Sequence, residues 1–195
     1  ALYKPYHRAL RRLINKAHQA FGTVILVDCH SMPSVGVSRD EPRRPDIVIG
    51  DRYGTSCASL LPDVVEDIMN GLGYSVGRNK PYAGGFITEH YGNPASGLHT
   101  VQLELNRAIY MDERRRERGP RFSQVATDFA ALAASAATFA SDNSAVRSAT
   151  SISRRSRWRA SAWSRVRTSA SMPLNASTSS LISSRLVFST TRSKS

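Results

Sequence analysis

A solid apolar run that ends abruptly in polar residues constrains the fold of this chain more than any other feature. Residues 23–27 read Thr-Val-Ile-Leu-Val, and Asp28, Cys29 and His30 follow at once. A short run of this kind predicts a strand buried on both faces, which belongs to a sheet covered by helices. Because side chains alternate along a strand, Asp28 and His30 are expected to share one face while Cys29 points to the other. Ligands collect at the carboxyl ends of such strands, so Asp28 and His30 form a candidate site.

Periodic patterns predict helices and further strands around this run. Residues 5–21 place apolar side chains at three- and four-residue steps and end at Gly22, as expected of an amphipathic helix. The same reasoning predicts helices over 60–71 and 122–139, short strands over 46–50 and 74–78, and either a strand or a loop over 86–91. Between the first two strands lies a long connection rich in Pro, Ser and Arg, and a loop of that length is often functional. The chain therefore predicts an α/β fold.

Strict alternation of apolar and polar residues over 99–106 predicts one more strand. Its core face would carry Val101, Leu103 and Leu105, and its other face Gln102, Glu104 and Asn106. A carboxylate facing out of a buried strand is costly unless a cation, a metal ion or hydrogen-bond donors hold it. Glu104 is thus either a functional group or the ion-pair partner of Arg107 or Arg52, and the pattern alone leaves both open.

His30 and Glu104 together indicate a hydrolytic zinc site. In such sites imidazole and carboxylate ligands hold the ion, and a free carboxylate takes a proton from water whose pKa the zinc lowers to about 7. A histidine at a strand end is, however, more often a hydrogen-bonded structural residue than a ligand. A hydrolase would also need groups to clamp its substrate, and the candidates are Arg52, Arg78, Asn79 and Tyr82. The alternative for each of these is ordinary surface or loop packing.

Charge divides the chain at Asp142. The chain carries 27 Lys and Arg against 15 Asp and Glu, and all 15 acidic residues lie at or before Asp142. We therefore separate a globular part, residues 1–142, from a basic tail rich in Ser and Arg, residues 143–195. The tail keeps no helical or strand period for more than a turn or two. This composition predicts a disordered segment, or one read from a shifted frame of a GC-rich gene.

Cysteine content and hydropathy indicate a cytoplasmic setting. The chain has 2 cysteines, Cys29 and Cys57, which form neither a disulfide framework nor a paired metal-binding motif. No apolar run is long enough to span a bilayer, and the first residues lack the apolar core of a signal peptide. We therefore expect no membrane association.

Several segments resemble the N-formylglutamate amidohydrolases, in the same order along residues 1–140. They are YKPYH at 3–7, VDCHSMPS at 27–34, DIVIGDR at 46–52, NKPYAGGFIT at 79–88 and QLELNR at 102–107. That family is similar in fold to zinc carboxypeptidases and aspartoacylase. It cleaves N-formyl-L-glutamate to formate and L-glutamate at the end of some histidine-degradation routes. The resemblance implies a mixed β-sheet flanked by helices, a zinc cofactor and a small-molecule substrate.

The resemblance also implies roles for individual residues. His30 would be a zinc ligand, Glu104 would stand at the position of the general base, and the substrate would be held by Arg52, Asn79 and Tyr82. Family members carry an N-terminal segment that supplies the first strands and the remaining zinc ligands, a histidine and an acid. Nothing before Asp28 offers a substitute, because His7 has no metal-ligand partner at helical spacing. The resemblance therefore predicts a C-terminal part, truncated at the N-terminus, that binds zinc poorly and hydrolyses little.

Alternative functions remain open from the sequence. One alternative is a catalytically inactive module whose basic tail, with Trp158 and Trp163 among the arginines, binds RNA or DNA. We do not expect this, because a solvated, unstructured tail explains the same composition. A zinc hydrolase acting on another N-acyl amino acid is a further alternative, since the sequence does not define the size of the pocket.

Overall fold

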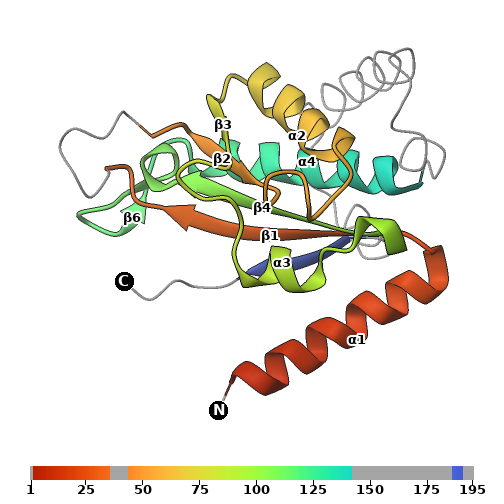
Figure 1. The fold of residues 1–195 in the computed structure, drawn as a ribbon. Coiled ribbons are helices and arrows are strands. Elements are labelled where there is room, and N and C mark those ends of the chain that lie inside the picture. The colour runs from red at the N-terminus through yellow and green to blue at the C-terminus, as the bar shows by residue number, and fades with distance from the viewer. Residues whose placement is uncertain (1, 36–43, 142–185, 191–195) are drawn as a thin grey trace.

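A 5-stranded mixed sheet forms the centre of the protein in a computed structural model, which describes residues 2–35, 44–141 and 186–190 (Figure 1). The strands are β1 (Val24–Met32), β2 (Ile47–Gly50), β3 (Val76–Arg78), β4 (Leu98–Asn106) and β7 (Leu186–Thr190), and they lie in the order β3-β2-β4-β1-β7. β1 pairs in parallel with β4 and β7, whereas β2 is antiparallel to β4 and parallel to β3. The predicted mixed α/β fold is confirmed.

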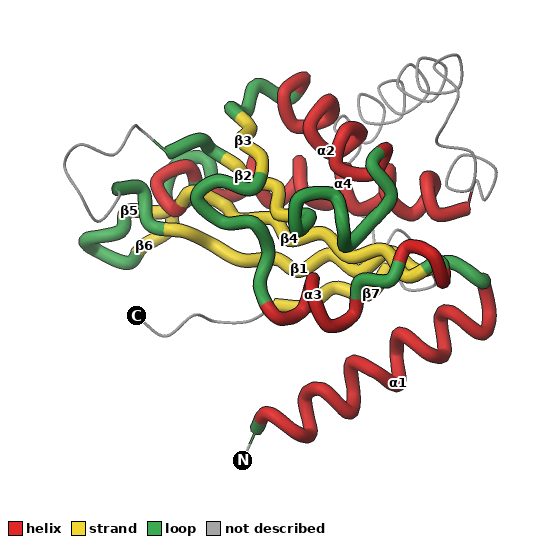
Figure 2. Tube along the Cα trace, viewed as in Figure 1, coloured by secondary structure: helices red, strands yellow, loops and turns green. Residues whose placement is uncertain are grey.

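Helices cover both faces of this sheet (Figure 2). α2 (Leu60–Gly71) and α4 (Phe122–Ser141) pack on one face, and α1 (Tyr3–Phe21) and α3 (Phe86–Tyr91) on the other. The remaining elements are short: the 3-10 turns η1 (Pro94–Ser96) and η2 (Arg107–Ile109), and a separate hairpin of β5 (Met111–Asp112) and β6 (Glu117–Arg118). Among the described helices, none combines the length and the apolar character needed to cross a membrane.

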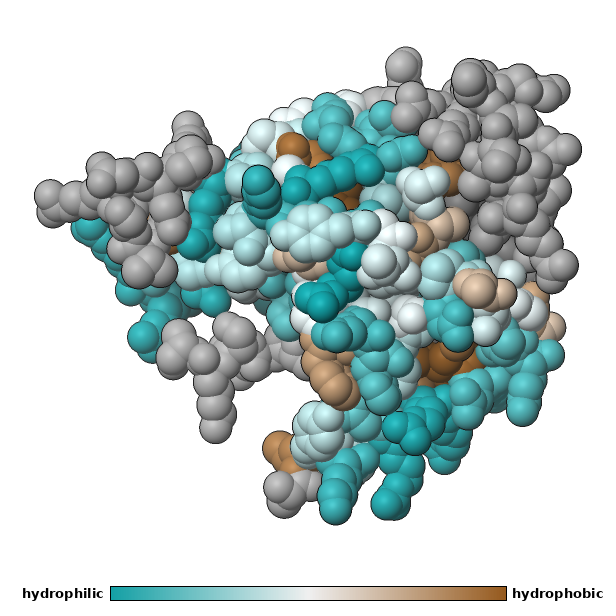
Figure 3. Space-filling view, viewed as in Figure 1, coloured by the Kyte–Doolittle hydropathy of each residue, from teal (hydrophilic) through white to brown (hydrophobic). Residues whose placement is uncertain are grey.

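The alternation of β1 explains why the sheet has two cores. Val27 belongs to the larger apolar cluster, beneath α2 and α4, whereas Leu26 belongs to the smaller one, with Leu10 and Ile14 of α1. The outward side of α1 is hydrophilic (Figure 3). α1 ends at Gly22, whose φ of 70° is left-handed, and its backbone N–H donates to the carbonyl of His18.

Most elements predicted from periodicity are confirmed, including the helices over 5–21, 60–71 and 122–139 and the strands over 46–50 and 99–106. The expectation for residues 86–91 is wrong, because this segment is helix α3 rather than a strand or a loop. Its 6 residues are too few to show a helical period. The helix places Ile87 and Tyr91, four residues apart, in the core beside α1.

β1 is longer than predicted. It pairs with β4 from Val24 to Met32, so Asp28 and His30 lie inside the strand rather than just beyond it. In the tail, residues 186–190 form β7 at the edge of the sheet. The rest of the predicted tail, with Trp158 and Trp163, lies outside the described residues, and its predicted disorder stays a prediction.

Candidate functional site

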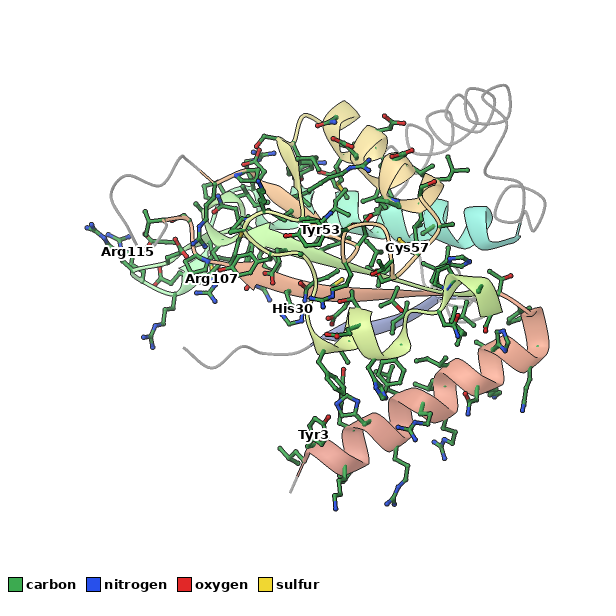
Figure 4. The ribbon with its side chains drawn as sticks, viewed as in Figure 1. Tyr3, His30, Tyr53, Cys57, Arg107 and Arg115 are labelled. Carbon is green, nitrogen blue, oxygen red and sulfur yellow. The ribbon has the colours of Figure 1, made fainter. Side chains whose placement is uncertain are left out.

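Polar side chains share one face of the β1–β4 pair. Asp28 stands opposite Gln102, and His30 stands opposite Glu104 in the parallel register. Asp28, Gln102 and Glu104 are only 1%, 4% and 7% exposed. Cys29 instead packs against the larger apolar cluster on the opposite face. The predicted sharing of one face by Asp28 and His30 is thus confirmed. The candidate site lies on the face of the sheet covered by α1 and α3, where Figure 4 labels His30.

The imidazole of His30 lies between both carboxylates of this face. Its Nε2 atom is 3.1 Å from Oδ2 of Asp28, and its Nδ1 atom is 3.9 Å from Oε1 of Glu104. A carboxylate accepts hydrogen bonds, so the contact with Asp28 places a proton on Nε2. This hydrogen bond is the main cause that raises the pKa of His30, against the opposing effect of burial. Gln102 adds a second donor, because its Nε2 atom is 3.3 Å from the same Asp28 oxygen.

Glu104 is a buried acid in a cationic setting. Burial raises its pKa, and the charge of Asp28 acts in the same direction. His30, Arg107 and Arg44 oppose that rise through their positive charges. A carboxyl group with a raised pKa is a better proton acceptor near neutral pH than an exposed one. This setting agrees with the predicted role of Glu104 as a general base, which stays a prediction.

Arg52 lies on a tight turn after β2 that Asn79 holds in place. The φ angle of Arg52 is 54°, which is left-handed and costly for this residue type. The side-chain amide of Asn79 accepts from the backbone N of Asp51 at 3.1 Å and donates to its Oδ1 at 2.7 Å. Arg52 itself forms an ion pair with Glu89 at 3.2 Å. Asn79 thus positions the turn that carries Arg52, and direct contact of either residue with a substrate stays a prediction.

Tyr82 contacts an arginine that the sequence did not single out. Its hydroxyl oxygen accepts from Nη1 of Arg44 at 3.3 Å, and the guanidinium carbon of Arg44 lies 5.7 Å from the centre of the Tyr82 ring. Arg78, another candidate clamp, is instead bound to Asp63 and Glu66 of α2, on the opposite face of the sheet. Arg78 is therefore a structural residue.

Comparison with known proteins assigns the chain to a family. The family model described as FGase, N-formylglutamate amidohydrolase, matches residues 1–111, which include His30 and Glu104. This chain belongs to the N-formylglutamate amidohydrolase family. Relatives named N-formylglutamate deformylase, from Pseudomonas putida and Pseudomonas aeruginosa, are each 37% identical over 113 residues, or 57% of this chain and 42% of theirs. The resemblance drawn from the sequence segments is confirmed.

A solved structure of the same family has a similar fold. The crystal structure of N-formylglutamate amidohydrolase from Ralstonia eutropha JMP134 is 38% identical, with a TM-score of 0.59. The match covers 65% of this chain and 46% of that one. The chain therefore spans less than half the length of the Pseudomonas and Ralstonia relatives.

The residues that the structure describes do not make a complete zinc centre. Within them, no group of three or more His, Cys, Asp or Glu side chains is placed to hold a metal ion. His30 does have the form of a single ligand, because Asp28 fixes Nε2 and so leaves Nδ1 as the donor atom. Oδ1 of Asp28 is buried without a hydrogen-bond partner among the described residues. The described part of the chain thus fits one imidazole ligand and its supporting carboxylate.

The sequence analysis does not identify Arg44 and Gln102 as residues of the candidate site. The sequence pattern places Gln102 on the polar face of its strand, and the register opposite Asp28 brings it into the candidate site. Arg44 lies near Glu104 because β2 runs antiparallel to β4, so that the residues before β2 meet the carboxyl end of β4. Strand direction depends on long-range pairing, and no local pattern around Arg44 shows it.

Proposed function

We propose that this chain carries part of the active site of a zinc-dependent enzyme that hydrolyses N-formyl-L-glutamate to formate and L-glutamate. The observation that carries the proposal is the contact of His30 with Glu104, inside the segment that matches the family. A bound zinc ion would supply a Lewis acid and lower the pKa of a water molecule to about 7. His30 would hold it through Nδ1, together with ligands from outside the described residues.

The chain's own residues would then handle the proton and the substrate. An oxygen of Glu104 accepts a proton from water as the water oxygen adds to the formyl carbon. The carbon–nitrogen bond breaks, and the proton passes to the departing nitrogen. The formic acid released then gives up its own proton to the amine, so that formate and L-glutamate with a protonated amino group are formed. Arg52 would bind a substrate carboxylate through its planar fork, with its turn held by Asn79, and Tyr82 would line the same pocket.

The thiols of the chain are poor nucleophiles, which favours the proposed activation of water by the carboxylate of Glu104. Burial raises the pKa of Cys29 and of Cys57 to about 12, so neither is a thiolate at neutral pH. Both are free thiols, which supports our placing the enzyme in the reducing cytoplasm. A role in histidine degradation is what the resemblance to the family implies. The mixed sheet, with His30 and Glu104 on neighbouring parallel strands, supports the proposed relationship to zinc carboxypeptidases.

Formate release from N-formyl-L-glutamate tests this function. We expect little release from the chain alone, because its described residues supply one imidazole ligand. We expect release once the chain is joined to the remaining part of the Ralstonia eutropha enzyme, and its loss with a chelator. In that protein, Glu104→Gln should lower kcat by about 10²- to 10⁴-fold, the usual contribution of a general base. The matched control is Glu117→Gln, an exposed acid of β6, which should change nothing.

Full activity of the Glu104→Gln variant would refute the role assigned to this residue. Equal hydrolysis of N-acetyl and N-formyl substrates would refute the assigned acyl group, while leaving the hydrolase itself in place.

A further inference from the structure

Arg44 is held by contacts with several segments at the carboxyl end of the β1–β4 pair. Its Nη1 atom donates to the carbonyl of Pro33, which directly follows β1, at 3.2 Å. The same atom donates to the hydroxyl of Tyr82 at 3.3 Å. The backbone carbonyl of Arg44 accepts from the side-chain amide of Asn106, the last residue of β4, at 3.5 Å. The guanidinium group is therefore positioned by the residue after β1 and by Tyr82, and the backbone of Arg44 is anchored to the end of β4.

This location brings a positive charge near the proposed general base. Asn106 shares a face of β4 with Glu104, and Pro33 lies three residues beyond His30. The charge of Arg44 is felt at Glu104, whose pKa it lowers against the effect of burial. Ring stacking on Tyr82 adds a cation–π contact, with 5.7 Å between the guanidinium carbon and the ring centre.

Arg52, by contrast, lies at the other end of β2. Arg44 precedes β2 and Arg52 follows it, with Val48 opposite Glu104 between them. Arg52 forms its ion pair with Glu89 of α3, and its charge is not among those that shift the pKa of Glu104. Arg44 is thus held at the end of the β1–β4 pair, where Asn106 shares a face with Glu104, whereas Arg52 is held against α3.

We propose that Arg44, stacked on Tyr82, binds a carboxylate of the amino-acid part of the substrate beside Glu104. The ligand class is an N-acyl amino acid and the free amino acid that its hydrolysis yields. A guanidinium group matches a carboxylate through parallel N–H donors, and a partly buried setting strengthens that contact. This inference rests on the proposed function, which names N-formyl-L-glutamate as the substrate but assigns no role to Arg44.

Binding of the product amino acid tests the inference without metal or turnover. L-glutamate, L-glutamine and 4-aminobutyrate would be titrated into the full chain and followed by ¹⁵N–¹H NMR shifts. Arg44→Gln should weaken L-glutamate binding by about tenfold or more, as expected for the loss of a charged hydrogen bond. Arg44→Lys should retain part of the affinity, because it keeps the charge and loses the fork. The control, Arg12→Gln on the exposed side of α1, should bind like the wild type.

The amino-acid analogues identify which carboxylate is bound. L-glutamine lacks the side-chain carboxylate, and 4-aminobutyrate lacks the α-carboxylate. The analogue whose binding is unaffected by Arg44→Gln lacks the group that Arg44 holds. Unchanged affinity of Arg44→Gln for L-glutamate would overturn the proposal, as would a wild-type chain that binds none of the ligands. Weaker binding with a matching loss of folded protein would assign Arg44 to the fold and would also overturn it.

Failure of this inference is distinguishable from failure of the proposed function. Arg44-dependent binding of L-glutamate with no formate release from the extended protein would refute the hydrolase and keep the carboxylate site. Formate release with an unchanged KM in Arg44→Gln would keep the hydrolase and refute the site.

Discussion

Replacing Glu104 with glutamine should stabilise the fold while it removes the proposed general base. The carboxylate is 7% exposed, and burial raises its pKa above the ordinary value of 4.5. A raised pKa means that the folded protein holds the proton more tightly than the unfolded chain. The charged form therefore destabilises the fold at neutral pH, by about 1.4 kcal/mol for each unit of pKa shift.

The pH dependence of the free energy of unfolding reveals the effect of the Glu104 charge. The contribution of Glu104 to wild-type stability should fall as the pH rises from 4.5 through its raised pKa, and Glu104→Gln should remove that contribution from the pH profile. We expect the variant to gain roughly 1 kcal/mol in free energy of unfolding at pH 7.5 and nothing at pH 4, measured by urea unfolding. The gain should grow in a His30→Gln background, because His30 lowers the pKa of Glu104. The exposed control Glu117→Gln should stay within about 0.5 kcal/mol.

A Glu104→Gln variant that is less stable than the wild type at pH 7.5 would refute this reasoning. It would show that the charge of Glu104 is held by its cationic neighbours as a structural ion pair, the alternative that the sequence left open.

Further predictions concern buried polar side chains and the turn that carries Arg52. Tyr74→Phe should lower the free energy of unfolding by about 1–3 kcal/mol in urea, because the Tyr74 hydroxyl donates at 2.6 Å to Asp128, a carboxylate only 3% exposed. Burial lowers the pKa of His99 below 6.5, so the contribution of His99 to stability should be lost as the pH falls from 6.5 through that lowered pKa, and His99→Gln should remove this contribution from the profile. Asn79→Ala should raise the KM for N-formyl-L-glutamate more than it lowers kcat, because it frees the turn that carries Arg52. Equal falls in kcat and kcat/KM would contradict this positioning role.

Local periodicity was enough to predict which side chains of β1 and β4 face the candidate site. A period of two placed His30 and Cys29 on different faces of their strand, and the same period placed Glu104 and Leu103 on different faces of theirs. Both strands are buried and regular, so local pattern and tertiary structure agree. The contact between His30 and Glu104 then follows from the parallel register, which the sequence alone does not define.

Features that depend on long-range contacts or on very short elements were not predicted. Helix α3 has only 6 residues and follows a glycine-rich loop, so its sequence shows no helical period. The left-handed turn at Arg52 depends on an amide that is 28 residues away from Asp51 in sequence, that of Asn79. Arg44 reaches the site only because β2 runs antiparallel to β4. For Arg52 and Arg44, a partner distant in sequence determines the geometry.

Titration of the His30 ring nitrogens by ¹⁵N NMR tests most directly the claim that this imidazole is shared by buried carboxylates. In the wild type, its pKa should lie above the ordinary value of 6.5, mainly because of the hydrogen bond to Asp28. Glu104→Gln should lower that pKa, and Asp28→Asn should lower it further. A His30 pKa that is the same in all these proteins would contradict the account.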